Sequence, residues 1–349
     1  MVTRPSLEQK LAPRIEAAIA DVTPGVVLRA YVGGAPVCDL QLGDTSLYYD
    51  LASLTKIVFT QQALMQAYDQ GLWTLDTTVG DVLPDYTHPH TRITELLTHT
   101  AGIAWWMPFY ESADLRLPWL ERRRWLYAQL QAAPCDKTGR AVYSDLGFML
   151  LGFVLEALYQ RNLLEVWQRL QASTYPGSSL AFHVDNHPLH PPAQYAPTEL
   201  CPWRHQRLQG QVHDDNTWAL GGISTHAGLF GSMDDLAAYG LQLRAQLRAL
   251  AGARVRQATA QLFARRAIAP QAGDWALGFM LPSPQGASCG RYFSPQSIGH
   301  TGFTGTSLWY DPERDLLVAI LSNRVYGGRD NKAFLALRPQ IHDWIVESL

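Results

Sequence analysis

Apolar and polar residues follow two different periods along this chain, and the period changes with position. Residues 7–19 place an apolar residue at every fourth position, which predicts a helix with one buried face. Two β-rich runs follow at residues 26–32 and 37–42, and the Gly33-Gly34 pair between them is typical of a hairpin turn. The chain therefore opens with a helix and a two-stranded hairpin.

The middle of the chain has the helical period. A helix is expected from about Ser53 to Tyr68, with Gly71 as its C-terminal stop, and another from Ser144 onward. Residues 172–215 are polar and proline-containing, which predicts a long surface excursion. Ser232 is expected to cap one more helix.

The last part turns β-rich again. Strands are expected at residues 275–281, 307–312 and 316–322, followed by a closing helix from about Asn331 that breaks or kinks at Pro339. Strands at both ends with helices between them predict an α/β fold of the α+β type, an antiparallel sheet built from both chain ends and flanked by helices.

We expect one catalytic domain over residues 1–349. Its α/β lobe would comprise about 1–58 and 222–349, and a large inserted helical lobe would comprise about 59–221.

Composition fits a well-buried globular enzyme, because 47% of residues are hydrophobic and 17% are charged. The formal net charge of −3 argues against a nucleic-acid partner. No apolar run is long enough to span a membrane. The N-terminus has no apolar leader, so a cytoplasmic location is expected, or a periplasmic one if a leader has been removed.

Neither a metal nor another cofactor is expected. The four cysteines lie far apart without a CxxC pair, which argues against a zinc site or a disulfide framework. His183, His187 and His190 are close in sequence, but prolines interrupt the segment. A solvated loop is favoured there over a metal site.

The stretch "DLASLTKIVFT" places Ser53 and Lys56 three residues apart, on one face of the predicted helix. Ser53 would lie in the first turn, where free backbone N–H groups favour a developing oxyanion. A lysine in a dry pocket can take a proton from serine. The alternative is an ordinary polar pair on an amphipathic helix.

Two further strings complete a pattern: "VYSDLGF" with Tyr143, Ser144 and Asp145, and "GHTGFTG" with His300, Thr301 and Gly302. Together with Ser53-Leu54-Thr55-Lys56 they resemble the three signatures of the penicillin-recognising serine hydrolases. The resemblance is to the class C β-lactamase and carboxylesterase branch, including penicillin-binding-protein-like enzymes. It covers about residues 7–345 and includes matching strings at 96–103, 210–230 and 309–324.

The resemblance implies roles for individual residues. Ser53 would be the acylated nucleophile, Lys56 would share its proton network, and Tyr143 would be the general base. The Lys56 cation should lower the pKa of Tyr143. The oxyanion hole would be the backbone N–H groups of Ser53 and of Phe303, the latter on the strand edge after the third motif. Trp105 would border the acyl pocket, with core packing as the alternative.

Two departures from the family pattern bear on the substrate. Asp145 stands where asparagine is usual, and it should hold Lys56 charged and disfavour a nearby carboxylate. His300 stands where lysine is usual and is only partly charged at neutral pH, which weakens docking of a β-lactam carboxylate. Thr301 and Gly302 complete this substrate-binding motif. Arg324 could hold a substrate carboxylate instead, or form a structural salt bridge.

Other candidates receive plainer interpretations. Ser288 in "GASCG" matches a nucleophile elbow, but loop-like sequence flanks it on both sides. His99 is expected to bond at a turn beneath the site. His213 and Asp214 either line the pocket or pin a loop.

The sequence thus predicts a serine hydrolase that forms an acyl-enzyme on Ser53, of esterase or amidase type, with little or no β-lactamase activity. Its partner would be a small ester, amide or peptide. The alternatives are a muropeptide amidase, a D,D-carboxypeptidase, or a non-catalytic binding protein that kept the fold. The oligomeric state is left open.

Overall fold

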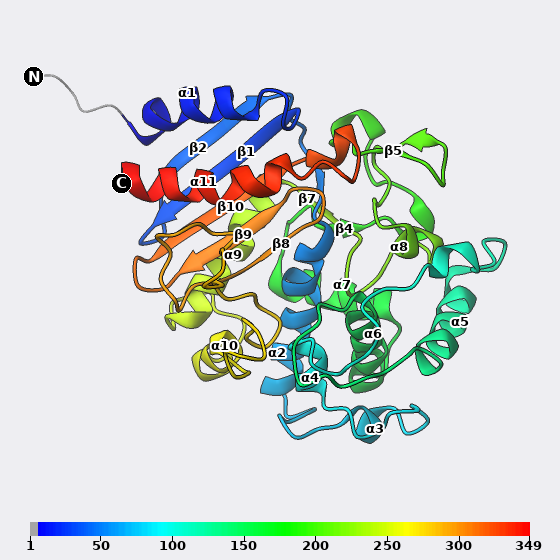
Figure 1. Ribbon diagram of the computed structural model, residues 1–349. Helices are drawn as coiled ribbons and strands as arrows, with labels where there is room; N and C mark the ends of the chain where they lie inside the picture. The colour runs from blue at the N-terminus through cyan, green and yellow to red at the C-terminus, as the bar shows by residue number, and fades with distance from the viewer. Residues whose placement is uncertain (1–5) are drawn as a thin grey trace, which may run out of the picture.

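The two ends of the chain meet in one five-stranded antiparallel sheet, in the order β2-β1-β10-β9-β8, as the computed structural model of residues 6–349 shows (Figure 1). Its strands are β1 (Gly25–Val32), β2 (Ala35–Gly43), β8 (Ile298–Thr301), β9 (Ser307–Asp311) and β10 (Leu316–Ser322). The predicted fold class, an antiparallel sheet made from both ends and flanked by helices, is confirmed. Residues 1–5 of the expected first lobe lie outside the described residues.

Helices cover both faces of this sheet (Figure 1). They are α1 (Leu7–Ile19), α2 (Gln62–Asp69), α3 (Val79–Val82), α4 (Ile93–Leu97), α5 (Trp119–Gln131), α6 (Asp145–Tyr159), α7 (Leu163–Thr174), α8 (Asp215–Ala219), α9 (Met233–Leu247), α10 (Gln257–Ala264) and α11 (Ala333–Ser348). Helices α1 and α11 pack on one face with Trp309 and Val318, and α2 and α9 pack on the other with Leu308 and Leu317. Strand β10 is consequently buried along its whole length, which makes it the centre of both cores.

Most elements follow from local sequence. The β1–β2 hairpin turns at Gly33 and Gly34, whose φ angles of +61° and +84° favour glycine. Ser232 caps α9 as predicted, accepting the backbone N–H of Asp235.

One predicted strand is absent. Residues 275–281 form no strand, because Gly278 has a φ of +89° and the N–H of Ala276 bonds back to Phe279, which folds the segment into a tight loop. At Pro339, where a break or a kink was expected, helix α11 runs on without a break. One lost backbone hydrogen bond is outweighed there by burial of the apolar face of the helix.

The chain between the two sheet-forming ends is mainly helical, with two small sheets. Strands β3 (Tyr49–Asp50), β7 (Leu229–Gly231) and β4 (Ala181–Phe182) form one, and β5 (Leu200–Cys201) and β6 (Gln206–Arg207) form the other. The predicted excursion at 172–215 holds only such short elements after α7 ends. No helix among residues 6–349 combines the length and apolar character needed to cross a bilayer.

Candidate active site

Ser53 lies at a sharp corner between a strand and a helical segment. Strand β3 leads into a 3₁₀ turn, η1 (Ala52–Leu54), and Ala52 there has a φ of +48°, which is costly for a residue with a Cβ. The carboxylate of Asp50 holds the corner: it accepts the N–H of Ala52 at 2.8 Å and that of His213 at 2.7 Å. Burial raises the pKa of Asp50, although these two hydrogen bonds oppose the rise.

Asp50 was not singled out from the sequence. The sequence does place this acidic residue directly before the apolar S-x-x-K segment. A carboxylate buried there needs hydrogen-bond donors from the backbone, and this requirement could have identified Asp50. The N–H of His213 bonds to Asp50, so His213 does pin a loop, one of the two roles considered for it.

The predicted helix after Ser53 is not a regular α-helix. Lys56–Gln61 form a π-helical segment, η2, before α2 begins at Gln62. π-helical turns are rare in proteins as a whole, but those that occur are often found at functional sites. The serine and lysine nevertheless face one another, with the Lys56 Nζ 3.1 Å from the Ser53 Oγ.

The Lys56 ammonium is fully buried, and all three of its N–H groups donate hydrogen bonds. Its Nζ donates to the Ser53 Oγ at 3.1 Å, to the Asp145 Oδ1 at 2.8 Å and to the backbone carbonyl of His226 at 2.9 Å. Burial alone would lower the Lys56 pKa, but Asp145 and Tyr143 outweigh it and the pKa is raised. The ion pair expected between Asp145 and Lys56 is therefore present, and Lys56 is charged at neutral pH.

The Tyr143 hydroxyl completes the group around the nucleophile, since it donates to the Ser53 Oγ at 2.8 Å. Burial raises the Tyr143 pKa and is the largest influence, while the Lys56 cation lowers it. The Lys56 cation acts in the expected direction, but the net pKa is raised, because desolvation of a fully buried phenol exceeds the effect of one cation that Asp145 already pairs.

His99 supports Tyr143 from behind. The His99 Nδ1 accepts the backbone N–H of Ser144 at 3.0 Å, and its ring centre is 4.6 Å from that of Tyr143. This is the structural role expected from the sequence. Ser144 in turn caps α6 by accepting the N–H of Gly147, which fixes Asp145 at the start of the helix.

Phe303 lies in the turn between β8 and β9 rather than on the strand edge where the sequence placed it. Its N–H donates to no acceptor within residues 6–349. Two hydroxyls tie this turn to the Ser53 corner: Thr304 donates to the carbonyl of Asp50 at 2.7 Å and Thr306 to that of Leu51 at 3.1 Å. The turn that carries the second expected oxyanion donor is thus bonded to the segment that carries Ser53.

Gly302 permits this close approach. A Cβ added at Gly302 would lie 2.0 Å from the Thr306 Oγ1 and 2.7 Å from the carbonyl oxygen of Leu51. No side chain larger than hydrogen fits between the two segments without moving one of them.

His300 supplies no positive charge. It is buried, its Nδ1–H donates to the carbonyl of Thr301 at 2.9 Å, and burial, with help from the Lys56 cation, lowers its pKa to about 3. The sequence predicted a partly charged histidine at this position, and in the fold His300 is neutral at pH 7 and offers no cation to a carboxylate. Thr301 lies beside it, with its hydroxyl 4.0 Å from the Met280 sulfur.

Arg324 is buried against Phe303. Its Cζ is 4.6 Å from the ring centre of Phe303, and the His213 ring stacks on Phe303 at 5.4 Å. Arg324 forms no ion pair with any residue of 6–349, so the salt-bridge alternative is wrong. The guanidinium packs the Phe303 turn instead.

Trp105 is one of the exposed aromatic side chains near Asp145. It is 61% exposed, which contradicts core packing, while its backbone carbonyl accepts the Asp145 N–H at 2.9 Å. Phe303 is also exposed, at 49%. Two aromatic rings are thus open to solvent on segments that adjoin the Ser53, Lys56 and Asp145 group.

The remaining candidates lie elsewhere. Ser288 has neither the strand before it nor the helix after it that a nucleophile elbow requires. His183 is buried against Phe230. Within the described part of the chain no group of three or more His, Cys, Asp or Glu residues is arranged to hold a metal ion.

The fold is an antiparallel sheet with helices on both faces, and its site is a serine that accepts hydrogen bonds from a lysine and a tyrosine. Together these features define a β-lactamase-related serine hydrolase. Comparison with known proteins agrees. The profile of the β-lactamase family matches residues 11–340, and the chain belongs to that family.

Relatives in this family have several named activities. The chain is 28% identical to a putative D-alanyl-D-alanine carboxypeptidase of Salmonella agona, and the match covers 92% of this chain and 81% of that protein. It is 30% identical to the N-acetylmuramyl-L-alanine amidase of Bacillus subtilis, and this match covers 80% of this chain and 68% of that protein. In fold it is similar to EstCE1, a hydrolase with promiscuous acyltransferase activity, at a TM-score of 0.69 and 20% identity over 96% of this chain and 99% of that one.

Proposed function

We propose that this protein hydrolyses esters or amides through an acyl-enzyme on Ser53, with little or no turnover of β-lactams. The observation that carries the proposal is the Ser53 hydroxyl, which receives hydrogen bonds from both Lys56 and Tyr143. A serine held between two polar groups that are themselves buried and oriented is the arrangement of an activated nucleophile.

Tyr143 is the proposed base, because Lys56 has no free lone pair while it is an ammonium with three acceptors. Once Tyr143 has lost its own proton to solvent, the phenolate takes the Ser53 proton while the Oγ attacks the substrate carbonyl. The N–H groups of Ser53 and Phe303 stabilise the oxyanion. Tyr143 then gives the proton to the leaving alcohol or amine, which departs and leaves the acyl group on Ser53. In the second half-reaction Tyr143 takes a proton from water as the water oxygen attacks the acyl carbonyl, and it returns the proton to the Ser53 Oγ as the acid is released.

The charges around Ser53 argue for a substrate without a carboxylate beside its scissile bond. His300 is neutral, Lys56 is paired, and Arg324 is buried behind Phe303. Asp145 adds a carboxylate of its own at this position. A D,D-carboxypeptidase must hold a terminal carboxylate next to the bond it cleaves, so this alternative is disfavoured, and so is efficient β-lactam hydrolysis.

A muropeptide amidase is the second candidate. The exposed rings of Trp105 and Phe303 can pack against the apolar face of a sugar or an acyl group, and the amide between muramic acid and a peptide has no carboxylate at the scissile carbon. The 30% identity to an N-acetylmuramyl-L-alanine amidase supports the same bond type.

The test is a mass-spectrometric comparison of wild type and Ser53→Ala, incubated with soluble muropeptides, simple acyl esters and a chromogenic cephalosporin. We expect cleaved esters or peptide released from muramic acid, and a loss of about 10³-fold or more in the variant. Removal of a terminal D-alanine as the main reaction would reject the substrate argument. Equal activity of the two proteins, or a fluorophosphonate adduct on Ser288, would reject the site.

A further inference from the structure

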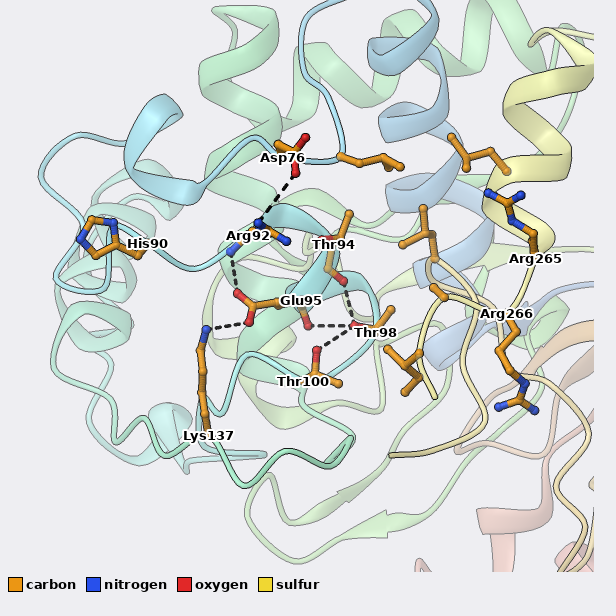
Figure 2. Close-up of a pocket in the computed structure, with 15 residues that line it drawn as sticks. Asp76, His90, Arg92, Thr94, Glu95, Thr98, Thr100, Lys137, Arg265 and Arg266 are labelled. Carbon is orange, nitrogen blue, oxygen red and sulfur yellow. Dashed lines mark hydrogen bonds and ion pairs between the residues drawn. The ribbon is translucent and has the colours of Figure 1, made fainter. Parts of the chain in front are cut away.

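Two hollows away from Ser53 share Arg265 and Arg266 as a common wall. The first, of about 490 Å³, lies beside α4 and is drawn in Figure 2. Its charges pair with one another: Lys137 contacts Glu95 at 2.6 Å, and Arg92 lies 3.8 Å from Asp76. Because Asp76 and Glu95 line this hollow together with its basic residues, it presents charges of both signs.

The second hollow, of about 800 Å³, lies between α10 and the β8–β9 edge of the sheet. Its apolar wall includes Leu247, Ala264, Leu281 and Ile298. The only charged side chains that line it are those of arginines, Arg248, Arg265 and Arg266, and no aspartate or glutamate of residues 6–349 lines it. It therefore combines an apolar surface with charge of one sign.

The positive charge in this hollow is not fully compensated. Arg265 forms no ion pair within residues 6–349. Asp315 is shared, since it accepts from Arg244 at 2.7 Å and lies 3.2 Å from the Arg248 Nε.

Arg266 has a carboxylate of its own, Asp274, at 2.9 Å. Counting Arg244 behind the wall, four arginines thus meet two carboxylates.

We propose that this hollow binds a small anionic amphiphile, with its carboxylate or phosphate head at Arg265 and its apolar body against Leu281 and Ile298. The volume is in the range of small-molecule sites, which are mostly apolar with a few polar groups that fix orientation. Arginine suits both head groups because its planar donors match two oxygens at once.

The position of the hollow connects it to the catalytic sheet edge. Ile298 begins β8 and pairs with Tyr310, which also lines the hollow, and His300 lies two residues further along the same strand. A ligand here contacts the strand that leads to the Phe303 turn without touching Ser53. The inference does not depend on the acyl-enzyme chemistry.

Isothermal titration calorimetry with octanoate, octyl phosphate, 1-octanol and octylamine tests the proposal. We expect one saturable site for octanoate or octyl phosphate, the tighter of the two identifying the head group, and no saturable binding of octanol or octylamine. The same binding by Ser53→Ala and by a protein blocked with fluorophosphonate would separate this site from the active site. Equal binding of octanol would overturn the charge argument.

Two variants locate the site. Ala264→Trp fills the hollow and should abolish binding, and Arg265→Gln should weaken it about fivefold, the value of one exposed ion pair. Arg254→Gln, which removes another exposed arginine outside the hollow, is the matched control and should bind as wild type does. Thermal melts check folding. Undiminished binding by a folded Ala264→Trp together with an unchanged Arg265→Gln would overturn the proposal.

Discussion

At the scale of single residues, one carboxylate contributes to two pKa values in the site. Asp145 raises the pKa of Lys56 and also that of Tyr143. It keeps the lysine an ammonium, and it makes the tyrosine harder to ionise. The residue that replaces the usual asparagine therefore adds to the effect of burial and makes the proposed base available only at higher pH.

Asp145→Asn should move the acid limb of the pH profile of kcat/KM to lower pH. The substitution removes the negative charge that raises the Tyr143 pKa, so the phenolate forms at lower pH. The measurement is kcat/KM for a neutral ester from pH 6 to 11, with the exposed Asp136→Asn as control. A limb that stays in place or moves upward would show that Tyr143 is not the titrating base.

Arg324 is expected to act as a positioning residue for the Phe303 turn. Arg324→Met removes the cation that packs on the ring and should lower kcat about tenfold, because the oxyanion donor loses its fixed position, while KM changes little. The loss should be equal for neutral and for carboxylate-bearing esters. A selective rise in KM for the carboxylate-bearing ester would instead show that Arg324 binds substrate.

Arg207→Met is the matched control for this variant. Arg207 also packs on an aromatic ring, with its Cζ 4.1 Å from the ring centre of Tyr326. A similar fall in kcat for both variants would mean that the effect is a general loss of packing.

At the scale of elements, the site lies where three segments of the chain contact one another. The corner from β3 into η1 carries Ser53, the start of α6 carries Asp145, and the β8–β9 turn carries Phe303. Two buried hydrogen bonds join the first of these to the last, because the hydroxyls of Thr304 and Thr306 donate to the backbone carbonyls of Asp50 and Leu51. The geometry of the nucleophile therefore depends on contacts between segments about 250 residues apart, not on the helix alone.

Gly302→Ala tests this junction. The added methyl would overlap the Thr306 hydroxyl and the Leu51 carbonyl, so we expect a loss of about 1–3 kcal/mol of unfolding free energy and a greater loss of activity. Urea unfolding and ester hydrolysis measure the two effects. Gly327→Ala is the control, because the nearest atom to its added Cβ is 3.9 Å away. Unchanged stability and activity in Gly302→Ala would contradict the close contact.

At the scale of the whole molecule, several histidines are buried in neutral form. Burial lowers the pKa of His300 to about 3, and that of His183 and His342 to about 4. An unfolded histidine titrates near 6.5. Because the folded pKa lies below the unfolded one, each group contributes its full stability above pH 6.5, and the contribution is lost as the pH falls toward the folded pKa.

We therefore expect the free energy of unfolding to fall between pH 7 and pH 5, by on the order of 2 kcal/mol per buried histidine. Urea unfolding at pH 7, 6 and 5 measures the slope. His342→Gln should flatten it, whereas the exposed His90→Gln should not. Asp50 acts in the opposite direction, because its raised pKa favours protonation in the fold. A stability that rises on acidification would refute the dominance of the histidines.

The sequence alone determined the features that depend on neighbours along the chain. Helix and strand periods, the Gly33-Gly34 turn and the Ser232 cap are local, and they were sufficient to predict an antiparallel sheet from both ends. The residue types at Ser53, Lys56 and Tyr143 carried the resemblance to the family. The segment at 275–281 failed because an apolar run reports burial, whereas its backbone path is set by Gly278.

Tertiary structure decided what depends on distance and dielectric. It gave the π-helical segment at Lys56, the buried brace of Asp50, the raised pKa of Tyr143 and the packing of Arg324 on Phe303. Each results from burial or from contact between distant segments. The strength of a charge depends on how much water surrounds it and on which groups lie within a few ångströms, and the order of residues does not specify either.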